Sequence, residues 1–180
     1  MSMAVVLQRV RDHLRSALAL SADQCGVRVG GHPPASSGEL YVAVDELGVE
    51  STARDHLREV YVVEVALWRR VGQWPDDRAG DALLRDDAYL AGALTLDRLE
   101  RSVIAALHGN YTDMPAAANA AIGAGSPGGG DVFQLALYYA GRARTEAWQD
   151  RRQSGSPTAW LGRRLKFAGM NRVQAMDVMQ

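Results

Sequence analysis

Histidine, cysteine and serine are the side chains in this 180-residue sequence that could support metal or nucleophilic chemistry. No histidine has another His or Cys at ligand spacing, and neither HExxH nor CxxC occurs; the four histidines are His13, His32, His56 and His108. No serine lies in a G-x-S-x-G turn, and Cys25 has only Arg28 as a basic neighbour. The sequence therefore predicts no catalytic, cofactor or metal site, and Cys25 is interpreted as a buried, inert thiol. A triad assembled from distant segments would escape this test.

Acidic and glycine-rich segments lead to the same prediction. Asp76-Asp77 and Asp86-Asp87 are adjacent pairs, which do not face each other on a helix, so we interpret them as solvated charges. The glycine-rich stretch 123–131 lacks the Lys and the following Ser/Thr with which a P-loop reaches phosphate and Mg²⁺. Glu64 interrupts an apolar strand, and we expect it to lie on the outward face opposite an arginine.

Arginine and aromatic side chains are the better candidates for function, as contacts between subunits. All basic residues except Lys166 are arginine, a bias that either a GC-rich genome or many protein contacts would produce. Aromatic residues and arginine are enriched at protein interfaces. The subunit-interface candidates are Trp68, Arg69, Arg70, Trp74, Tyr138, Tyr139, Arg142, Arg144, Trp148 and Trp160. Two alternatives stay open: the tryptophans cap the core locally, and the C-terminal arginines contact DNA phosphate.

Composition limits the remaining classes of protein. The net charge of −1 gives no global field for nucleic acid or an anionic membrane. One cysteine cannot form an internal disulfide. No signal peptide is visible, and no run of about 18 apolar residues could form a membrane-spanning helix. We therefore expect a soluble protein of one domain, residues 1–180.

Two amphipathic helices and several strands are expected to form that domain. Val6, Val10, Leu14 and Leu18 recur at a spacing of four, with Leu7 and Ala17 widening the stripe. A second helix is predicted from Thr95, as N-cap, to His108. Strands are predicted over 26–30, 39–46 and 57–71. In the second of these, Leu40, Val42 and Val44 share one face, and Tyr41, Ala43 and Asp45 share the other.

The longest strand pattern runs from Leu57 to Val71 with a period of two. It would span roughly 50 Å at about 3.3 Å per residue, far more than a typical strand. Either it bends, or it projects as an arm that reaches a neighbouring subunit, or it is two strands joined at a bulge.

The C-terminal half is less regular. Residues 109–131 are expected to form a flexible insertion loop, and 132–162 an irregular extension in which 132–139 and 143–148 are ambiguous between strand and helix. Residues 164–168 and 172–178 read as two short strands around Gly169. The predicted fold is α+β: a mixed or antiparallel sheet with two amphipathic helices on one face and a long loop-rich insertion.

This order of elements resembles the tail terminator family of long-tailed phages. The resemblance covers residues 3–110 and 163–180 and lies in the order of patterns rather than in a diagnostic motif. An N-terminal helix comes first, and His32-Pro33-Pro34 then leads into the strand 39–44. The long strand 59–67 and the helix 96–108 follow, and a strand pair at 165–169 and 172–177 closes the chain. The stretch 109–159 is longer than a minimal member needs.

The resemblance implies a mixed sheet with two helices on one face and a virion protein, made in the host cytoplasm, that needs no active site. Six copies would form a homohexameric ring at the head-proximal end of the tail. The implied partners are the tail tube protein and the head-connector or stopper protein, and DNA would pass through the ring without sequence-specific binding. The strand 57–71 and the loop 109–131 are expected to supply contacts. The alternatives are another neck or baseplate component, such as an adaptor or stopper, and a small α+β enzyme or ligand-binding module.

Overall fold

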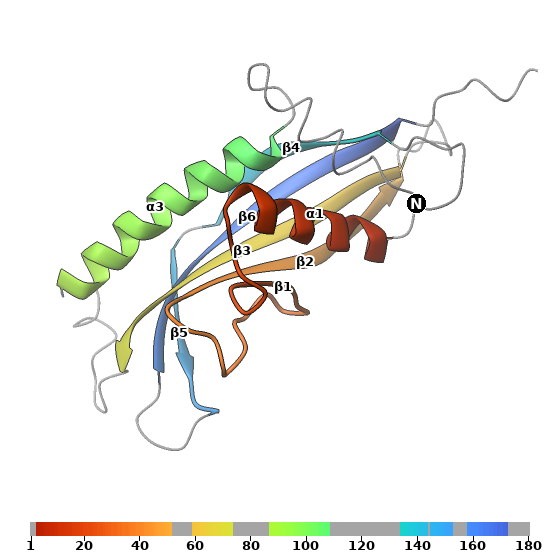
Figure 1. Ribbon diagram of the computed structural model, residues 1–180. Coiled ribbons are helices and arrows are strands. Elements are labelled where there is room, and N and C mark those ends of the chain that lie inside the picture. Colours follow the sequence, from red (N-terminus) through yellow and green to blue (C-terminus); the bar gives the residue numbers. More distant parts are fainter. Residues whose placement is uncertain are drawn as a thin grey trace, which may run out of the picture.

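The computed structural model describes residues 3–51, 59–73, 87–108, 134–143, 145–152 and 158–172 (Figure 1). Along the chain the elements are α1 (Met3–Ala17), β1 (Cys25–Val27), β2 (Leu40–Ser51), β3 (Glu59–Gln73), α3 (Asp87–Leu107), β4 (Gln134–Arg142), β5 (Glu146–Asp150) and β6 (Thr158–Arg172). None of the described helices is long and apolar enough to cross a membrane.

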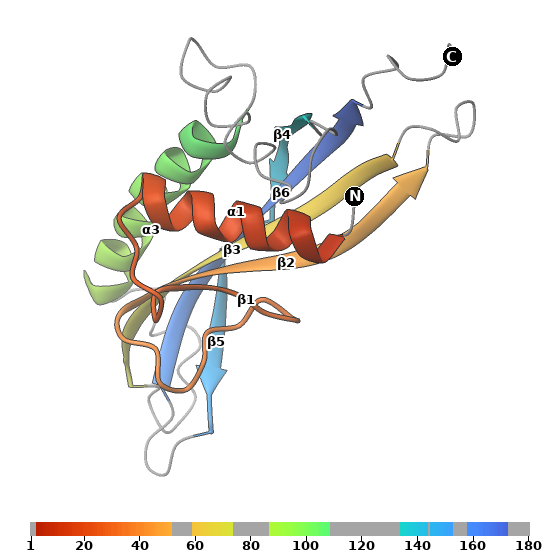
Figure 2. The same ribbon diagram turned by 45° about the vertical axis from the view of Figure 1, so that its right-hand side comes forward.

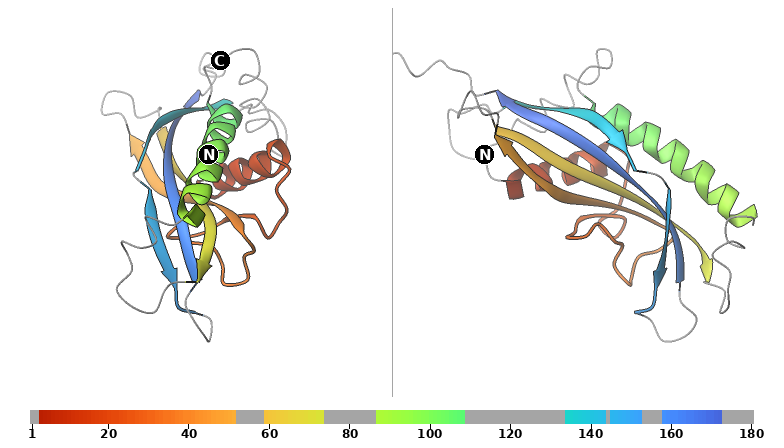
Figure 3. Two further views of the ribbon diagram at one scale, coloured as in Figure 1. Left: turned by 90° about the vertical axis from the view of Figure 1, so that its left-hand side faces the viewer. Right: turned by 180° about the vertical axis from the view of Figure 1, so that it is seen from behind.

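The strands form one mixed, six-stranded sheet in the order β1-β2-β3-β6-β4, with β5 also paired to β6. Only β1 and β2 are parallel; the other pairs are antiparallel. Strands β4 and β5 follow one another along the same side of β6, since Arg142 lies opposite Leu165 and Glu146 opposite Gly162. Figure 3 shows this interrupted edge from behind. The predicted α+β class is confirmed.

Both helices pack on the same face of the sheet and form one hydrophobic core with it (Figures 1 and 2). The predicted stripe of α1 is largely right, because Val6, Leu7, Val10 and Leu14 are buried there. Ala17 is exposed, so its predicted place in the stripe is wrong. The sheet contributes Val42, Val44, Tyr61, Val63, Val65, Leu67, Leu137, Leu161, Leu165 and Phe167. The alternation predicted for 39–46 and for 57–71 therefore assigned the side chains of β2 and β3 to the correct face, whereas no alternation was predicted for those of β4 and β6.

Helix α3 begins at Asp87, eight residues before the predicted N-cap. Thr95 lies inside the helix, where its hydroxyl donates to the carbonyl of Ala91 at 2.9 Å, so the predicted cap is wrong. A Thr side chain satisfied by the preceding turn does not interrupt the helix. Gly92 also lies inside helix α3. A Cβ at this position would come within 2.8 Å of Val71, so the close packing of α3 against β3 favours glycine.

Strand β3 is one continuous strand of 15 residues, so the alternative of two strands is wrong for 59–73. It pairs with β2 from Glu59 to Arg69 and with β6 from Val60 to Gln73. Because both sides are occupied within its own chain, these residues do not form a free arm. The register shifts only between Arg70 and Gly72 against β6, and on β2 between Glu46 and Gly48. Residues 57 and 58 lie outside the described part of the chain.

The described residues within 132–162 form β4, β5 and the start of β6, so the prediction of an irregular extension is wrong for them. The predicted break at Gly169 is also wrong: β6 is continuous through it, with Tyr61 on one side and Leu137 on the other. Pairing on both sides outweighs the weak strand preference of a single glycine. The predicted loop 109–131 and the residues after Arg172 lie outside the described residues.

Strand β1 is shorter than predicted and ends at Val27. The amide of Arg28 still donates to the carbonyl of Val44, and the chain then turns through Gly30 and Gly31, both at positive φ. The carboxylate of Asp45 accepts from the Gly30 amide at 2.7 Å and from the Glu46 amide at 2.8 Å. This side chain ends the pairing of β1 with β2 and directs residues 28–39 across the other face of the sheet.

Candidate interaction surfaces

The sheet face without helices carries a second, smaller apolar cluster. Its buried members come from β2, β3 and β6, with the partly buried Trp148 of β5 packed against them; they are Tyr41, Ala43, Ala66, Trp68 and Trp160. Segment 28–39 lies against this cluster: the indole N–H of Trp68 donates to the carbonyl of Gly31 at 2.6 Å, and the His32 ring stacks on Trp148 with centroids 4.6 Å apart. Segment 28–39 is therefore packed against the sheet rather than exposed as a free loop.

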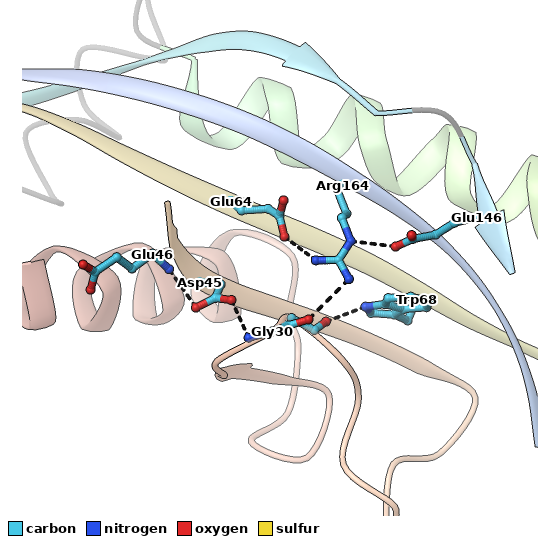
Figure 4. Close-up of polar contacts among 8 residues, drawn as sticks. Gly30, Asp45, Glu46, Glu64, Trp68, Glu146 and Arg164 are labelled. Carbon is cyan, nitrogen blue, oxygen red and sulfur yellow. Dashed lines mark hydrogen bonds and ion pairs between the residues drawn. The ribbon is translucent and has the colours of Figure 1, made fainter. Parts of the chain in front are cut away.

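Arg164 joins four segments on this face (Figure 4). Its guanidinium contacts Glu64 of β3 at 2.5 Å and Glu146 of β5 at 2.6 Å, and it donates to the carbonyl of Gly30 at 3.3 Å. Burial disfavours the charge of Arg164, but the bonds to both carboxylates outweigh it and raise the Arg164 pKa. Glu64 is paired with an arginine, as predicted, but its side chain is only 13% exposed, so the predicted outward position is wrong. The residue directly opposite it in β6 is Lys166.

A second arginine holds the same loop near the end of β5. Arg152 contacts both carboxylate oxygens of Asp150, at 2.7 and 2.8 Å, and donates to the carbonyl of Pro33 at 2.7 Å. Its guanidinium also lies over the Trp148 ring, 4.9 Å from the centroid. The hydrogen bond from Arg152 lowers the pKa of Asp150. Asp150 is buried, and its negative charge is paired with Arg152 rather than directed at a ligand.

On the helix side, Arg163 joins α3 to β6. It is buried and bonds to Asp97 and Glu100 of α3, the latter at 2.8 Å. Glu100 also accepts from Arg142 of β4 at 3.0 Å. The bond from Arg163 lowers the pKa of Asp97. This cluster holds α3 against the sheet.

The structure corrects two of the predicted interface residues. Trp68 is fully buried and Trp160 is 3% exposed, so neither can contact another subunit. Trp68 bonds to Gly31, and both rings belong to the second cluster, against which Trp148 of β5 packs. This agrees with the alternative that the tryptophans cap the core. Trp74 and Arg144 lie outside the described residues.

The other predicted interface residues are at least partly exposed but are scattered. Arg69 pairs with Glu39 at 2.9 Å, and Arg70 is exposed beside it. Arg142 is half-exposed and paired with Glu100. The remaining three pack against rings of their own chain: Tyr138 against His108, Tyr139 against Phe167, and Trp148 against His32. Tyr139 and Trp148 pack against the clusters on opposite faces of the sheet, so these residues do not all belong to one surface.

One cavity, of about 230 Å³, lies between the end of β3 and the first half of α3. Its lining residues are Arg69, Arg70, Val71, Ala91, Gly92 and Thr95. Among the lining residues that the structure describes, the two arginines are the only ionisable side chains, and the Thr95 hydroxyl is bonded within the helix. In the described part of the chain no group of three or more His, Cys, Asp or Glu side chains could hold a metal ion. Cys25 is buried, and this burial raises its pKa to about 11.

Three exposed apolar pairs were not found from the sequence. On α3, Leu90 and Leu94 are 56% and 60% exposed; on β2, Leu47 and Val49 are 50% and 47% exposed; at and just after the end of β1, Val27 and Val29 are 41% and 98% exposed. The spacing of four between Leu90 and Leu94 would have indicated the first pair, had the helix been predicted to begin before Thr95. Leu47 lies at the bulge and Val49 beyond it, in a part of β2 that the sequence pattern did not include. Exposed apolar groups of this kind are typical of interaction sites when they cluster.

In comparisons with known proteins, no protein-family model and no curated protein matches the chain.

Proposed function

We propose that this protein is a structural virion subunit, a tail terminator that forms a ring at the head-proximal end of a phage tail. The observation that supports this most is the fold: one mixed sheet with both helices on a single face. The elements α1, β2, the long β3 and α3 follow one another in the order that the family resemblance implies. The described chain closes on one strand, β6, where the resemblance implied a strand pair. A fold alone does not define a function, so the proposal depends on an assembly test.

The way in which charged residues are used supports a structural role. Arg163, Arg164 and Arg152 each bond to a carboxylate, and each joins segments that are distant in the sequence. Such contacts make a rigid body out of a long, twisted sheet. A ring subunit under load needs this rigidity, whereas an enzyme needs polar groups directed into a cavity.

The proposed partners follow from the position of a terminator. Each copy would contact two neighbours in a six-membered ring, the tail tube protein on one side and the head-connector or stopper protein on the other. DNA would pass through the ring without sequence-specific contacts. Such a protein would work in the virion neck without a cofactor.

Native mass spectrometry of the purified full chain tests this proposal. A six-fold species is the expected result for a terminator. A twelve-fold species would instead favour a connector adaptor. A chain that stays monomeric at all concentrations would contradict a ring protein and favour the ligand-binding or enzymatic class.

A further inference from the structure

Two unlike patches on this chain have complementary chemistry. The helix stripe consists of Leu90, Leu94, Arg98 and Arg101, all exposed on α3 at spacings of three and four. It combines an apolar pair with two cations. The nearby acidic residues of the same helix, Asp97 and Glu100, bond to Arg163 of β6. Asp97 remains 43% exposed and also interacts with the charge of Arg101, so it offsets part of the positive charge of the stripe.

The strand patch lies on β2 beyond its pairing with β1. It consists of the exposed Glu46, Leu47 and Val49, next to the half-buried carboxylate of Asp45. Strand β1 pairs only with residues 42–44, so within the described residues β2 has a strand on one side only from Glu46 onward. The patch thus offers an apolar pair, a negative charge and an unpaired strand edge, which other chains commonly contact.

The two patches cannot meet within one molecule. The N-terminal half of α3 and the C-terminal half of β2 lie at opposite ends of the sheet in Figures 1 and 2 and in the right panel of Figure 3. A patch that meets its own kind across a two-fold axis would bring Arg98 and Arg101 towards the same arginines. Contact between the helix stripe and the strand patch instead brings the two arginines close to Glu46. It also places the leucine pair of the stripe against the apolar pair of the patch. Charge complementarity therefore favours contact between unlike patches.

We propose that the helix stripe of one copy binds the strand patch of a second copy of this chain. A contact between unlike surfaces is heterologous, and it produces a closed ring when the rotation closes. This inference rests on the proposed ring function and specifies the two surfaces that hold the ring together.

The test uses one disabling substitution in each patch. Leu94→Asp places a charge in the helix stripe, and Val49→Asp places one in the strand patch. Ser16→Asp, on the exposed side of α1, is the matched control. Native mass spectrometry is expected to show rings for the wild type and the control, and monomers for each patch variant. Mixed in equal amounts, the two variants are expected to form dimers only, since each still has one intact patch.

The outcomes separate this inference from the ring proposal. If both patch variants form rings, or if their mixture stays monomeric, the pairing of these two patches is wrong. The proposal that the protein forms a ring would still stand. A monomeric wild type would overturn both. Circular dichroism melting checks that each variant is folded; if Leu94→Asp melts early, Arg98→Glu replaces it. Combining Arg98→Glu with Glu46→Arg is then expected to restore the ring, because the charges are exchanged rather than removed.

Discussion

Gly162 lies directly opposite Trp68 in the pairing of β3 with β6, and replacing it with alanine tests how tightly the second cluster is packed. A Cβ at this position would lie 2.4, 2.5 and 2.8 Å from three atoms of the six-membered ring of Trp68. The indole cannot move easily, because it is fully buried and its N–H is bonded to Gly31. The His32 and Trp148 rings also lie against it, with centroids 5.2 and 5.8 Å away.

The expected cost of Gly162→Ala is about 2–4 kcal/mol in the free energy of unfolding. Overpacking a core typically costs about 1–3 kcal/mol. Displacing the indole also weakens a buried hydrogen bond, which contributes about 1 kcal/mol. This is a large part of the roughly 5–15 kcal/mol that stabilises a domain.

Urea unfolding followed by far-ultraviolet circular dichroism measures this cost, at one fixed protein concentration because assembly shifts apparent stability. Gly38→Ala is the control: a Cβ there meets no atom within 4 Å. In a Trp68→Leu background the ring atoms that Gly162→Ala would meet are gone, so the substitution is expected to cost under about 1 kcal/mol. An equal cost in both backgrounds, or none in the wild type, would falsify the proposed contact.

Four further outcomes are expected. The Cys25 thiol, with its pKa of about 11, should react with a thiol reagent at pH 8 roughly a hundredfold more slowly in the folded than in the urea-unfolded chain. Burial, and then the charge of Arg164, lowers the pKa of His32. The contribution of His32 to stability should therefore be complete above the unfolded pKa of about 6.5 and be lost as pH falls below it. Urea titrations of His32→Gln should lack this dependence of the free energy of unfolding on pH. Arg163→Met should cost about 2–4 kcal/mol in the same assay, more than Arg142→Met, because it deprives the buried Glu100 of its buried partner. Deleting residues 124–130 should impair docking of the ring to its partners in a pull-down assay without lowering the melting temperature.

Side-chain alternation predicted the two faces of the sheet well, because a period of two depends on backbone geometry alone. Val42 and Val44 face the helices, while Tyr41 and Ala43 face the second cluster, as expected. What the alternation cannot indicate is what covers each face. The burial of Trp68 depends on a loop 37 residues away in the sequence, through its bond to Gly31.

Errors at element ends have a common cause. Thr95 and Gly169 carry local signals for a helix start and a strand break, and in both places tertiary contacts outweigh the signal. The Thr95 hydroxyl is satisfied by the preceding helical turn, and Gly169 is paired on both sides. The ion pairs of Arg163 and Arg164 join residues 63 and 100 positions apart, so no local pattern could predict them. Only the expectation of an arginine opposite Glu64 came from the sequence.

The covered second face supports the proposal that assembly contacts lie at the ends of the molecule. One face of the sheet is occupied by α1 and α3, and part of the other by the segment that Arg164 and Arg152 hold in place. Loosening this segment to expose Trp68 to a neighbour would break charge-assisted bonds and unpack a buried tryptophan, at a cost of several kcal/mol. The helix stripe and the strand patch need no such rearrangement, because their apolar side chains are already exposed. A ring built through them would therefore form from subunits that keep their monomeric structure.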